Sequence, residues 1–384
     1  MKTLVSNITR GFGTGTTRRT FAMSAARAES RMQRWFPGTA HPLIVSAPMA
    51  FISNPKLASE VSRADGLGFI QGGRSFKPDS PSVRELDEQL TLARSLLGKG
   101  EGSGGHLPIG VGFVLFSDCA ATHFGETTAP VLARHRPAAV WLFAPDPDKP
   151  DTLRRVVEAV RSAASAEWKP RVIVQVGTVA AARQAAELGA DVIVAQGVDA
   201  GGHQFVKSAG IVSLVPEVRD MVREEFPDRE IVVWAAGGIA DGRGVAAALA
   251  LGAEAAVMGT RYIVAPESDA QDYKRQALLS ASDGAANTVK SYMHDHVQGT
   301  WNWPSLYDAR ALVHPSYTDD LAGMPIKENE ARYKAAKEKG DFSMMVTWSG
   351  SGVGLIRDAA PAAEITKKVR EEATKTIRGL KASL

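Results

Sequence analysis

Residues 194–203 read Val-Ala-Gln-Gly-Val-Asp-Ala-Gly-Gly-His and place a histidine beside three glycines at the end of an apolar run. Glycines at this density let the backbone turn tightly or let a ligand approach it closely. The imidazole of His203 follows the turn directly, and an imidazole can gain or lose a proton near neutral pH. The segment therefore predicts a ligand site at the carboxyl end of a buried strand, with His203 beside it.

Eight short apolar runs, with helical stretches between them, must position this histidine. They span residues 42–49, 68–73, 107–116, 137–144, 171–177, 191–197, 230–238 and 255–264. Several are almost continuously apolar, which is typical of strands covered on both faces by helices. Eight β-then-α units in about 250 residues predict the α/β fold class and a (β/α)8 (TIM) barrel. The rival is a doubly wound open sheet, which usually has its glycine fingerprint after the first strand, where this chain has Ala47-Pro48-Met49.

Two of the intervening segments carry helix signals of their own. In residues 178–189, Arg183 and Glu187 are spaced as an i,i+4 ion pair and Gly189 follows the last turn. Residues 241–252 begin with Asp241, a residue type that caps helix N-termini.

The apolar pattern divides the chain into four parts. Residues 1–36 form an N-terminal extension and residues 37–265 the barrel. Residues 266–345 follow the eighth strand and predict a smaller, mostly helical lid or substrate domain. Residues 346–384 contain a glycine-rich loop and a terminal helix, which we expect to return to the barrel.

Composition narrows the class of protein. The chain has 384 residues, of which 44% are hydrophobic, and no apolar stretch is long enough for a membrane span. Cys119 is the single cysteine, which excludes an internal disulfide and a cysteine-based zinc site. Residues 1–40 carry a net charge of +6 and the remainder −3, which argues against nucleic acid as the main partner. Nothing in the sequence decides the oligomeric state.

The N-terminal extension is rich in Arg, Ser and Thr and contains one acidic residue, Glu29. This composition is typical of a mitochondrial transit peptide and equally of a disordered extension. Mitochondrial and cytoplasmic locations therefore both stay open.

Two glycine turns predict a phosphate site. Gly237-Gly238 ends the seventh apolar run, and Gly259-Thr260 lies within the eighth. Bare backbone amides and a helix N-terminus at these positions are where barrels commonly bind phosphate, and Thr260 adds a hydroxyl donor. The alternative is two tight turns with no other purpose.

Other strand ends offer groups for a planar ring. Gln71, Gln175 and Gln196 carry carboxamides, which both donate and accept hydrogen bonds, although each of them alone is equally well explained as a satisfied core glutamine. Ala47-Pro48-Met49 supplies backbone groups and a soft thioether, which suit the underside of a ring. Together with the phosphate site, these residues predict a flavin mononucleotide (FMN) across the barrel mouth.

Three motifs resemble the nitronate monooxygenase family, formerly called 2-nitropropane dioxygenases. They are SAPM at 46–49, QVGTVAAARQAAELGADVIVAQGVDAGGH at 175–203 and AAGGIADGRGVAAALALGAEAAVMGTR at 235–261. The resemblance covers about residues 40–270, with a further match near 348–355. It implies an FMN-containing barrel that oxidises nitronates with O2 to carbonyl compounds and nitrite, with His203 as the active-site residue. Two positions depart from the family pattern: Ser351 stands where Gln is frequent, and Asp199 where Glu is frequent.

On this reading, His203 is the catalytic residue and no metal is expected. Neutral His203 can take the α-proton of a nitroalkane, and protonated His203 can pair with the nitro oxygens. The alternative is a histidine that is only buried and hydrogen-bonded. The residues expected to bind FMN are Ala47, Pro48, Met49, Gln71, Gln175, Gln196, Gly201, Gly202, Gly237, Gly238, Gly259 and Thr260.

Other candidates for chemistry lie in the predicted lid. His294 and His296 form a His-x-His pair, but no third metal ligand is evident nearby, so a solvated lid loop is the favoured interpretation. The aromatic residues Trp301, Trp303 and Tyr307 suit equally a wall of the substrate cavity and a packed lid hinge.

Three other functions compete with nitronate oxidation. One is an FMN-dependent NAD(P)H reductase acting on a quinone or an enoyl thioester, because related barrels share the glycine–histidine motif. Another resembles IMP dehydrogenase, but that chemistry needs a nucleophilic cysteine after the sixth strand, where this chain has none. The third is a non-catalytic flavin- or phosphate-binding barrel.

Overall fold

The computed structural model describes residues 30–99, 105–117 and 119–383. Eight strands lie within the eight predicted runs and share one sheet. They are β1 (Leu43–Ser46), β2 (Gly68–Gln71), β3 (Leu107–Val114), β4 (Pro137–Phe143), β5 (Arg171–Val176), β6 (Val192–Gln196), β8 (Val232–Ala236) and β9 (Ala255–Met258).

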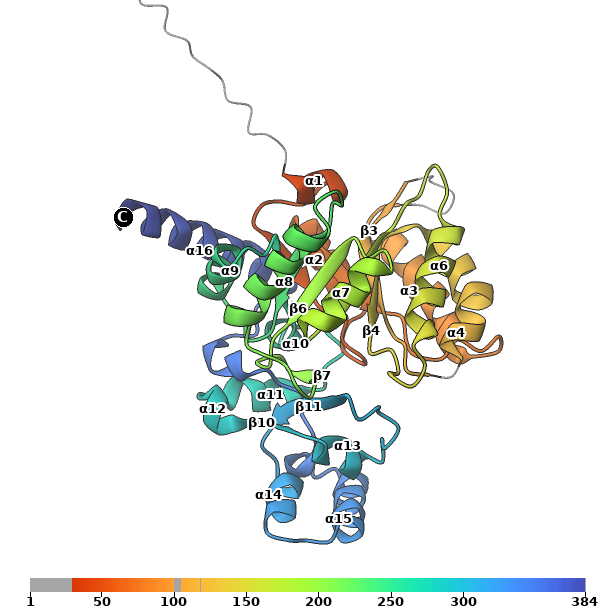
Figure 1. The fold of residues 1–384 in the computed structure, drawn as a ribbon. Helices are drawn as coiled ribbons and strands as arrows, with labels where there is room; N and C mark the ends of the chain where they lie inside the picture. Colours follow the sequence, from red (N-terminus) through yellow and green to blue (C-terminus); the bar gives the residue numbers. More distant parts are fainter. Residues whose placement is uncertain (1–29, 100–104, 118, 384) are drawn as a thin grey trace, which may run out of the picture.

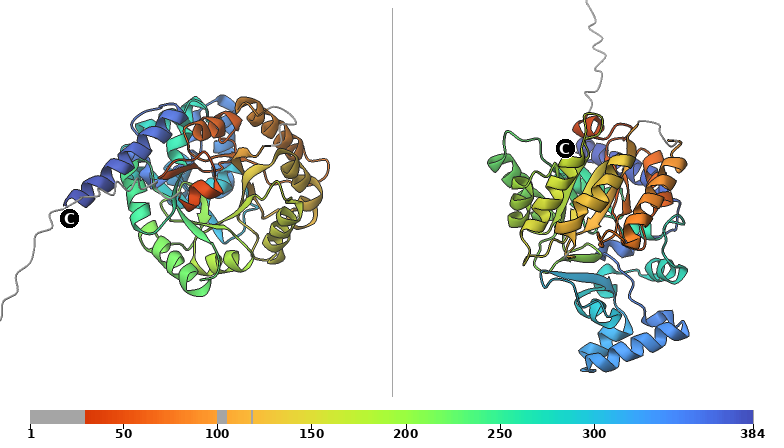
Figure 2. Two further views of the ribbon diagram at one scale, coloured as in Figure 1. Left: turned by 90° about the horizontal axis from the view of Figure 1, so that it is seen from above. Right: turned by 90° about the vertical axis from the view of Figure 1, so that its right-hand side faces the viewer.

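All neighbouring pairs in this sheet are parallel, in the order β1-β9-β8-β6-β5-β4-β3-β2. The two end strands are joined by a parallel bridge between Val45 and Leu67, which closes the sheet (Figures 1 and 2). The predicted (β/α)8 barrel is confirmed, and the doubly wound alternative is excluded.

The eighth predicted run was too long. Strand β9 ends at Met258, and a short helix, α10 (Thr260–Ile263), follows within the same apolar run. Gly259 ends the strand because its backbone leaves the extended region, with φ −107° and ψ −78°. Because Tyr262, Ile263 and Val264 continue the apolar residues beyond Arg261, hydrophobicity alone did not mark the end of the strand.

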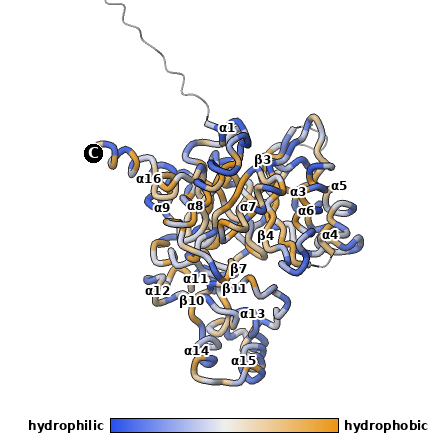
Figure 3. The backbone as a smooth tube through the Cα atoms, viewed as in Figure 1, coloured by the Kyte–Doolittle hydropathy of each residue, from blue (hydrophilic) through white to orange (hydrophobic). Residues whose placement is uncertain are grey.

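The strands bury both faces, which explains their continuous hydrophobicity (Figure 3). On β1, Leu43 and Val45 pack into the barrel interior with Trp141 and Trp234, whereas Ile44 packs against the surrounding helices. Side chains therefore fill the barrel, and a ligand finds room only at its ends.

Helices cover the outside of the barrel. They are α2 (Pro55–Arg63), α3 (Pro81–Leu96), α4 (Ala120–His123), the π-helix η1 (Phe124–Thr128), α5 (Ala129–His135), α6 (Asp151–Ala163), α7 (Val179–Glu187), α8 (Ile211–Glu225) and α9 (Gly242–Ala250).

Two sequence-based details of these helices have different outcomes. Asp241 caps α9 by accepting hydrogen bonds from two backbone N–H groups of its first turn, as predicted. Arg183 of α7 was expected to pair with Glu187, but its guanidinium donates two hydrogen bonds to Glu225 of α8, at 2.5 and 2.7 Å. A neighbouring helix offers the planar guanidinium a two-point contact, which a partner one turn along the same helix does not match.

A short helix closes the amino-terminal end of the barrel. In α1 (Arg31–Trp35), Ser30 caps the helix, and Met32 packs into the barrel interior together with Phe36. The last residues of the predicted 1–36 extension therefore pack with the barrel, while residues 1–29 lie outside the described residues.

The lid lies at the opposite end of the barrel from α1 (Figures 1 and 2). It contains α11 (Asp272–Ser280), α12 (Gly284–Asn287), β10 (Thr288–Ser291), α13 (Met293–Gln298), β11 (Tyr307–Leu312), α14 (Pro315–Leu321), α15 (Ile326–Lys339) and η2 (Phe342–Met344). Its strands join β7 (Gly202–Phe205), which follows β6, in an antiparallel sheet of order β10-β11-β7. A barrel loop thus supplies one strand of the lid.

The chain then returns to the barrel through η3 (Ser351–Leu355) and α16 (Ala362–Ser383). Helix α16 packs on the barrel wall beside α2 and α9, where Thr366 and Tyr262 share a hydrogen bond of 2.7 Å and Arg370 donates to the carbonyls of Pro42 and Ala64. No helix in the described part of the chain combines the length and hydrophobicity needed to cross a membrane.

Candidate active site

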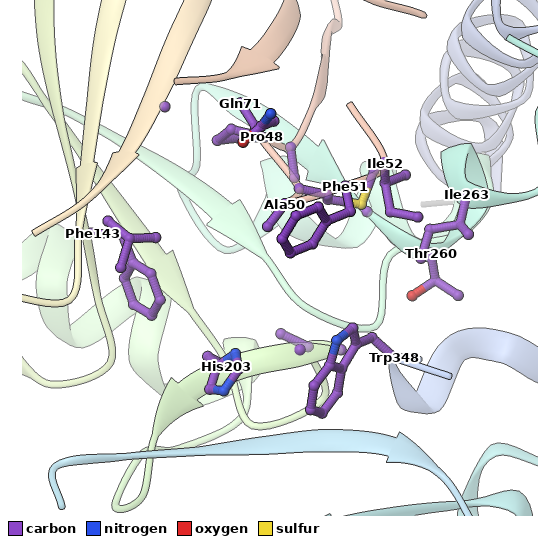
Figure 4. Close-up of a pocket in the computed structure, with 18 of the residues that line it drawn as sticks. Pro48, Ala50, Phe51, Ile52, Gln71, Phe143, His203, Thr260, Ile263 and Trp348 are labelled. Carbon is purple, nitrogen blue, oxygen red and sulfur yellow. The ribbon is translucent and has the colours of Figure 1, made fainter. Parts of the chain in front are cut away.

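A cavity of about 570 Å³ lies between the carboxyl ends of the barrel strands and the lid (Figure 4). Its volume is typical of sites for small molecules and cofactors, roughly 300–1,000 Å³. His203 and all twelve residues expected to bind FMN line it: Ala47, Pro48, Met49, Gln71, Gln175, Gln196, Gly201, Gly202, Gly237, Gly238, Gly259 and Thr260. They converge because the carboxyl ends of parallel strands meet at one rim.

Glycine turns interlock along one part of this rim. Gly237 and Gly238 follow β8 with φ +111° and +72°, backbone conformations that residues other than glycine rarely adopt. The C-terminal loop lies against them, and a Cβ added to Gly352 would come within 2.5 Å of the Gly238 carbonyl oxygen. The Gly350 amide donates to Thr260 Oγ1 at 3.0 Å, which ties this loop to the turn after β9. Sequence analysis had singled out the C-terminal loop without placing it at the rim.

Free backbone amides support the predicted phosphate site more strongly than a helix dipole does. Neither the Gly238 nor the Thr260 amide donates a hydrogen bond to another of the described residues. The Thr260 hydroxyl accepts one hydrogen bond and keeps its own proton to donate. The helix that begins at Thr260 has only four residues, so its dipole adds little.

The three glutamines have different surroundings. Gln175 accepts a hydrogen bond of 3.0 Å from the Trp141 indole, so its oxygen is satisfied within the barrel. The Gln196 amide donates to the His203 carbonyl at 3.2 Å, but its Oε1 is buried and has no partner in the described part of the chain. Gln71 lines the cavity at the end of β2, on the side opposite His203 (Figure 4). The buried oxygen of Gln196 is thus free to accept a hydrogen bond at the cavity wall.

The loop after β1 is held by one hydroxyl group. Ser53 Oγ donates to the Ala47 carbonyl at 2.9 Å and accepts from the Met49 amide at 3.0 Å. These two bonds fix the backbone on either side of Pro48 at the cavity rim.

His203 lies on β7, opposite Ala309 of β11, so the small sheet sets its position. Its Nε2 is 3.0 Å from both carboxylate oxygens of Asp295. Its ring stacks on Trp303, with centroids 3.5 Å apart and planes 10° apart, and the Trp348 ring lies 5.1 Å away. The Asp295 carboxylate and the Trp303 ring therefore fix the orientation of His203 at the cavity wall.

Asp295 lines the cavity and contacts His203, but sequence analysis did not single it out. It lies on α13, and the residue is only 4% exposed. The sequence did carry a signal, because Asp295 is the middle residue of the His-Asp-His segment that had been considered for its histidines.

The interpretation of His294 and His296 as part of a solvated loop is wrong. Both lie on α13, and His294 is fully buried, with Nε2 3.0 Å from the Val289 carbonyl and Nδ1 2.9 Å from Nε2 of His314. Burial lowers the pKa of His294, and burial together with the neighbouring His294 lowers the pKa of His314 to about 4. These two histidines are neutral structural residues at neutral pH. In the described part of the chain, no three His, Cys, Asp or Glu side chains are grouped to hold a metal ion.

The three aromatic residues Trp301, Trp303 and Tyr307 do not share one role. Trp303 lines the cavity, whereas Trp301 is 54% exposed and stacks on His296. Tyr307 is buried, with its hydroxyl donating to the Pro145 carbonyl at 2.9 Å, and its pKa is raised by burial. One residue of the three is thus cavity wall, and Tyr307 packs the lid against the barrel.

The two departures from the family pattern touch each other. Ser351 Oγ donates to a carboxylate oxygen of Asp199 at 2.7 Å, and the Ser351 amide donates to the Asp199 carbonyl at 3.0 Å. This pair joins the C-terminal loop to the turn that precedes His203.

The fold and this site define a (β/α)8-barrel enzyme that holds a ligand between its barrel rim and a lid. The family model of nitronate monooxygenase matches residues 160–372. A nitronate monooxygenase of Neurospora crassa is 47% identical over 368 residues, which are 94% of this chain and 96% of that protein. The chain therefore belongs to the nitronate monooxygenase family.

Solved structures agree with this assignment. FabK from Thermotoga maritima superposes with a TM-score of 0.68 and 26% identity, over 92% of this chain and 99% of that one. A nitroalkane oxidase from Streptomyces ansochromogenes gives a TM-score of 0.66 and 25% identity, over 91% of this chain and all of that one.

Proposed function

We propose that this chain is an FMN-dependent enzyme that oxidises alkyl nitronates, and also nitroalkanes, with O2 to a carbonyl compound and nitrite. One observation carries the proposal: every residue that the sequence predicted for FMN lines a single cavity, and His203 faces the same cavity from the lid. Membership of the nitronate monooxygenase family supports the same chemistry.

The residues present fit FMN at both of its ends. The buried Gln196 oxygen would accept a hydrogen bond from the ring of FMN, which would give this unsatisfied polar atom of the cavity wall a partner. The amides of Gly238 and Thr260, with the Thr260 hydroxyl, would hold the phosphate. When bound, FMN would supply the redox chemistry that links oxidation of the substrate to reduction of O2.

The chain's own residues bind and orient the substrate. A nitronate is an electron-rich anion, and the cavity holds it beside the ring while Trp303 and Trp348 exclude water. For a neutral nitroalkane, an additional proton must be removed from the α-carbon, and His203 is the group placed to take it. No step requires NAD(P)H.

The test uses the full chain, purified without added flavin. We expect a yellow protein that consumes O2 and releases nitrite with ethyl nitronate in the absence of NAD(P)H. A yellow protein that ignores the nitronate but is bleached by NADH would instead establish the reductase alternative. A colourless protein that gains no nitrite-forming activity with added FMN would contradict the proposal outright.

A further inference from the structure

The two ring nitrogens of His203 have different surroundings. Nε2 faces both oxygens of the Asp295 carboxylate at 3.0 Å. The hydrogen bonds of the ring in the described part of the chain involve Nε2 and not Nδ1, and the side chain lines the cavity (Figure 4). Because a carboxylate only accepts hydrogen bonds, the hydrogen of a neutral imidazole belongs on Nε2, which leaves the lone pair on Nδ1.

Asp295 is held in place for this contact. Thr300 Oγ1 donates to Asp295 Oδ1 at 2.9 Å, and the Thr300 amide donates to the Asp295 carbonyl at the same distance. The Asp295 side chain is 6% exposed, so water competes little for its oxygens. The Trp303 ring, stacked on the imidazole, opposes rotation of the histidine out of this geometry.

We propose that Asp295 is a positioning residue that keeps His203 in the tautomer with a free Nδ1, so that Nδ1 removes the α-proton of neutral nitroalkanes. This inference rests on the proposed function. It adds that neutral nitroalkanes need Asp295, whereas nitronates do not. In the step, the α C–H bond breaks, its proton forms an N–H bond at Nδ1, and the electron pair stays on the substrate as a nitronate. The imidazolium that forms is paired with the Asp295 side chain through Nε2.

The proposal predicts that the two substrate classes respond differently. A positioned general base contributes about 10²–10⁴-fold to a proton transfer. A preformed nitronate has already lost its α-proton, so its oxidation does not use the base. Loss of Asp295 should therefore slow nitroalkane turnover far more than nitronate turnover.

The first test measures kcat/KM of the FMN-loaded enzyme with neutral nitroethane and with ethyl nitronate. For Asp295→Asn, we expect a loss of at least about 10²-fold with nitroethane, but less than about 5-fold with the nitronate. Asp295→Glu should recover part of the nitroethane rate. Asp320→Asn removes a lid carboxylate outside the cavity and should leave both values unchanged. Equal losses on both substrates would overturn the inference.

The second test needs no activity. Imidazole ¹⁵N NMR of the purified protein, with His203 assigned by comparison with His203→Asn, should show the Nε2–H tautomer in the wild type and a mixture in Asp295→Ala. A wild-type His203 with its hydrogen on Nδ1 would overturn the inference even if nitronate turnover is normal. Absence of nitrite from nitronate with the wild-type enzyme would instead refute the proposed function, so the two failures are distinguishable.

Discussion

The barrel rim and the lid contribute to one cavity in different ways. The rim offers mostly backbone, in glycine turns such as Gly237-Gly238 and in the loop after β1. The lid offers side chains, above all Asp295 and Trp303, which hold His203 through a carboxylate and a stacked ring. The rim is thus suited to cradle a cofactor and the lid to orient a proton-transfer group.

Mutations should therefore be able to affect FMN binding and substrate turnover separately. Backbone at the rim is fixed by the closed parallel barrel, whereas the His203 contacts depend on the pairing of β7 with β11. Changes at the rim should alter FMN retention, and changes in the lid should alter turnover while FMN stays bound.

The largest expected effect is at His203. His203→Asn removes the base but no rim contact, so the enzyme should keep FMN and lose about 10²–10⁴-fold of its turnover of nitroalkanes. Flavin absorbance per protein and kcat/KM, measured on the same sample, check both parts. His296→Asn is the control and should stay near wild type, because His296 stacks on Trp301 and does not line the cavity. Near-normal activity of His203→Asn would remove this histidine from the mechanism.

The second effect is a dependence of protein stability on pH that arises from His314 in the lid. The pKa of His314 is about 4 in the folded protein because of burial, against about 6.5 when unfolded. Between these values the unfolded chain binds more protons, so stability is complete above pH 6.5 and falls as the pH drops toward 4, by up to about 3 kcal/mol. Thermal unfolding between pH 7 and 4.5 measures this loss. His314→Gln cannot titrate and should give a flatter profile; an unchanged slope would show that His314 is not responsible.

At the rim, Gly201→Ala should release FMN. A Cβ at this position would come within 2.4 Å of the Gly350 amide nitrogen, so the C-terminal loop must move. Overpacking of this kind costs about 1–3 kcal/mol, or roughly 5- to 150-fold in the FMN dissociation constant. Fluorescence titration of the apoprotein with FMN measures it. Gly125→Ala, in η1, would meet only the Ala159 methyl at 3.5 Å and should bind as the wild type does. Equal affinities of the two variants would contradict the role of the interlocked turns.

The smallest expected effect is the loss of the stacked ring. Trp303→Ala removes a contact worth about 0.5–1.5 kcal/mol, which corresponds to roughly 2- to 12-fold in kcat/KM, with FMN content unchanged. Trp301→Ala is the matched control because that ring stacks on His296 outside the cavity. If both variants lose the same activity, the ring acts through lid stability and does not hold His203.

The sequence predicted the barrel and its rim well because both follow from local patterns. Apolar runs identify the strands, and in a parallel barrel all strand ends meet at one rim, so residues as distant as Ala47 and Thr260 could be grouped without knowing a contact. Their role in binding FMN stays a prediction.

The lid was harder to predict because its geometry depends on long-range pairing. The sequence predicted a turn that ends at Gly202 and no strand over β7, and its partner β11 lies about a hundred residues further along the chain. No periodicity links His203 to Asp295, and burial of His294 depends on the same packing.

A mitochondrial or cytoplasmic location also stays a prediction, since residues 1–29 lie outside the described part of the chain.

The most direct test of the account is anaerobic mixing of the purified, flavin-loaded protein with ethyl nitronate, followed by flavin absorbance. We expect the nitronate to bleach the flavin without NAD(P)H, and the colour to return, with nitrite release, when O2 is admitted. Flavin absorbance that stays unchanged with the nitronate but bleaches with NADH would contradict it and identify a reductase built on the same barrel.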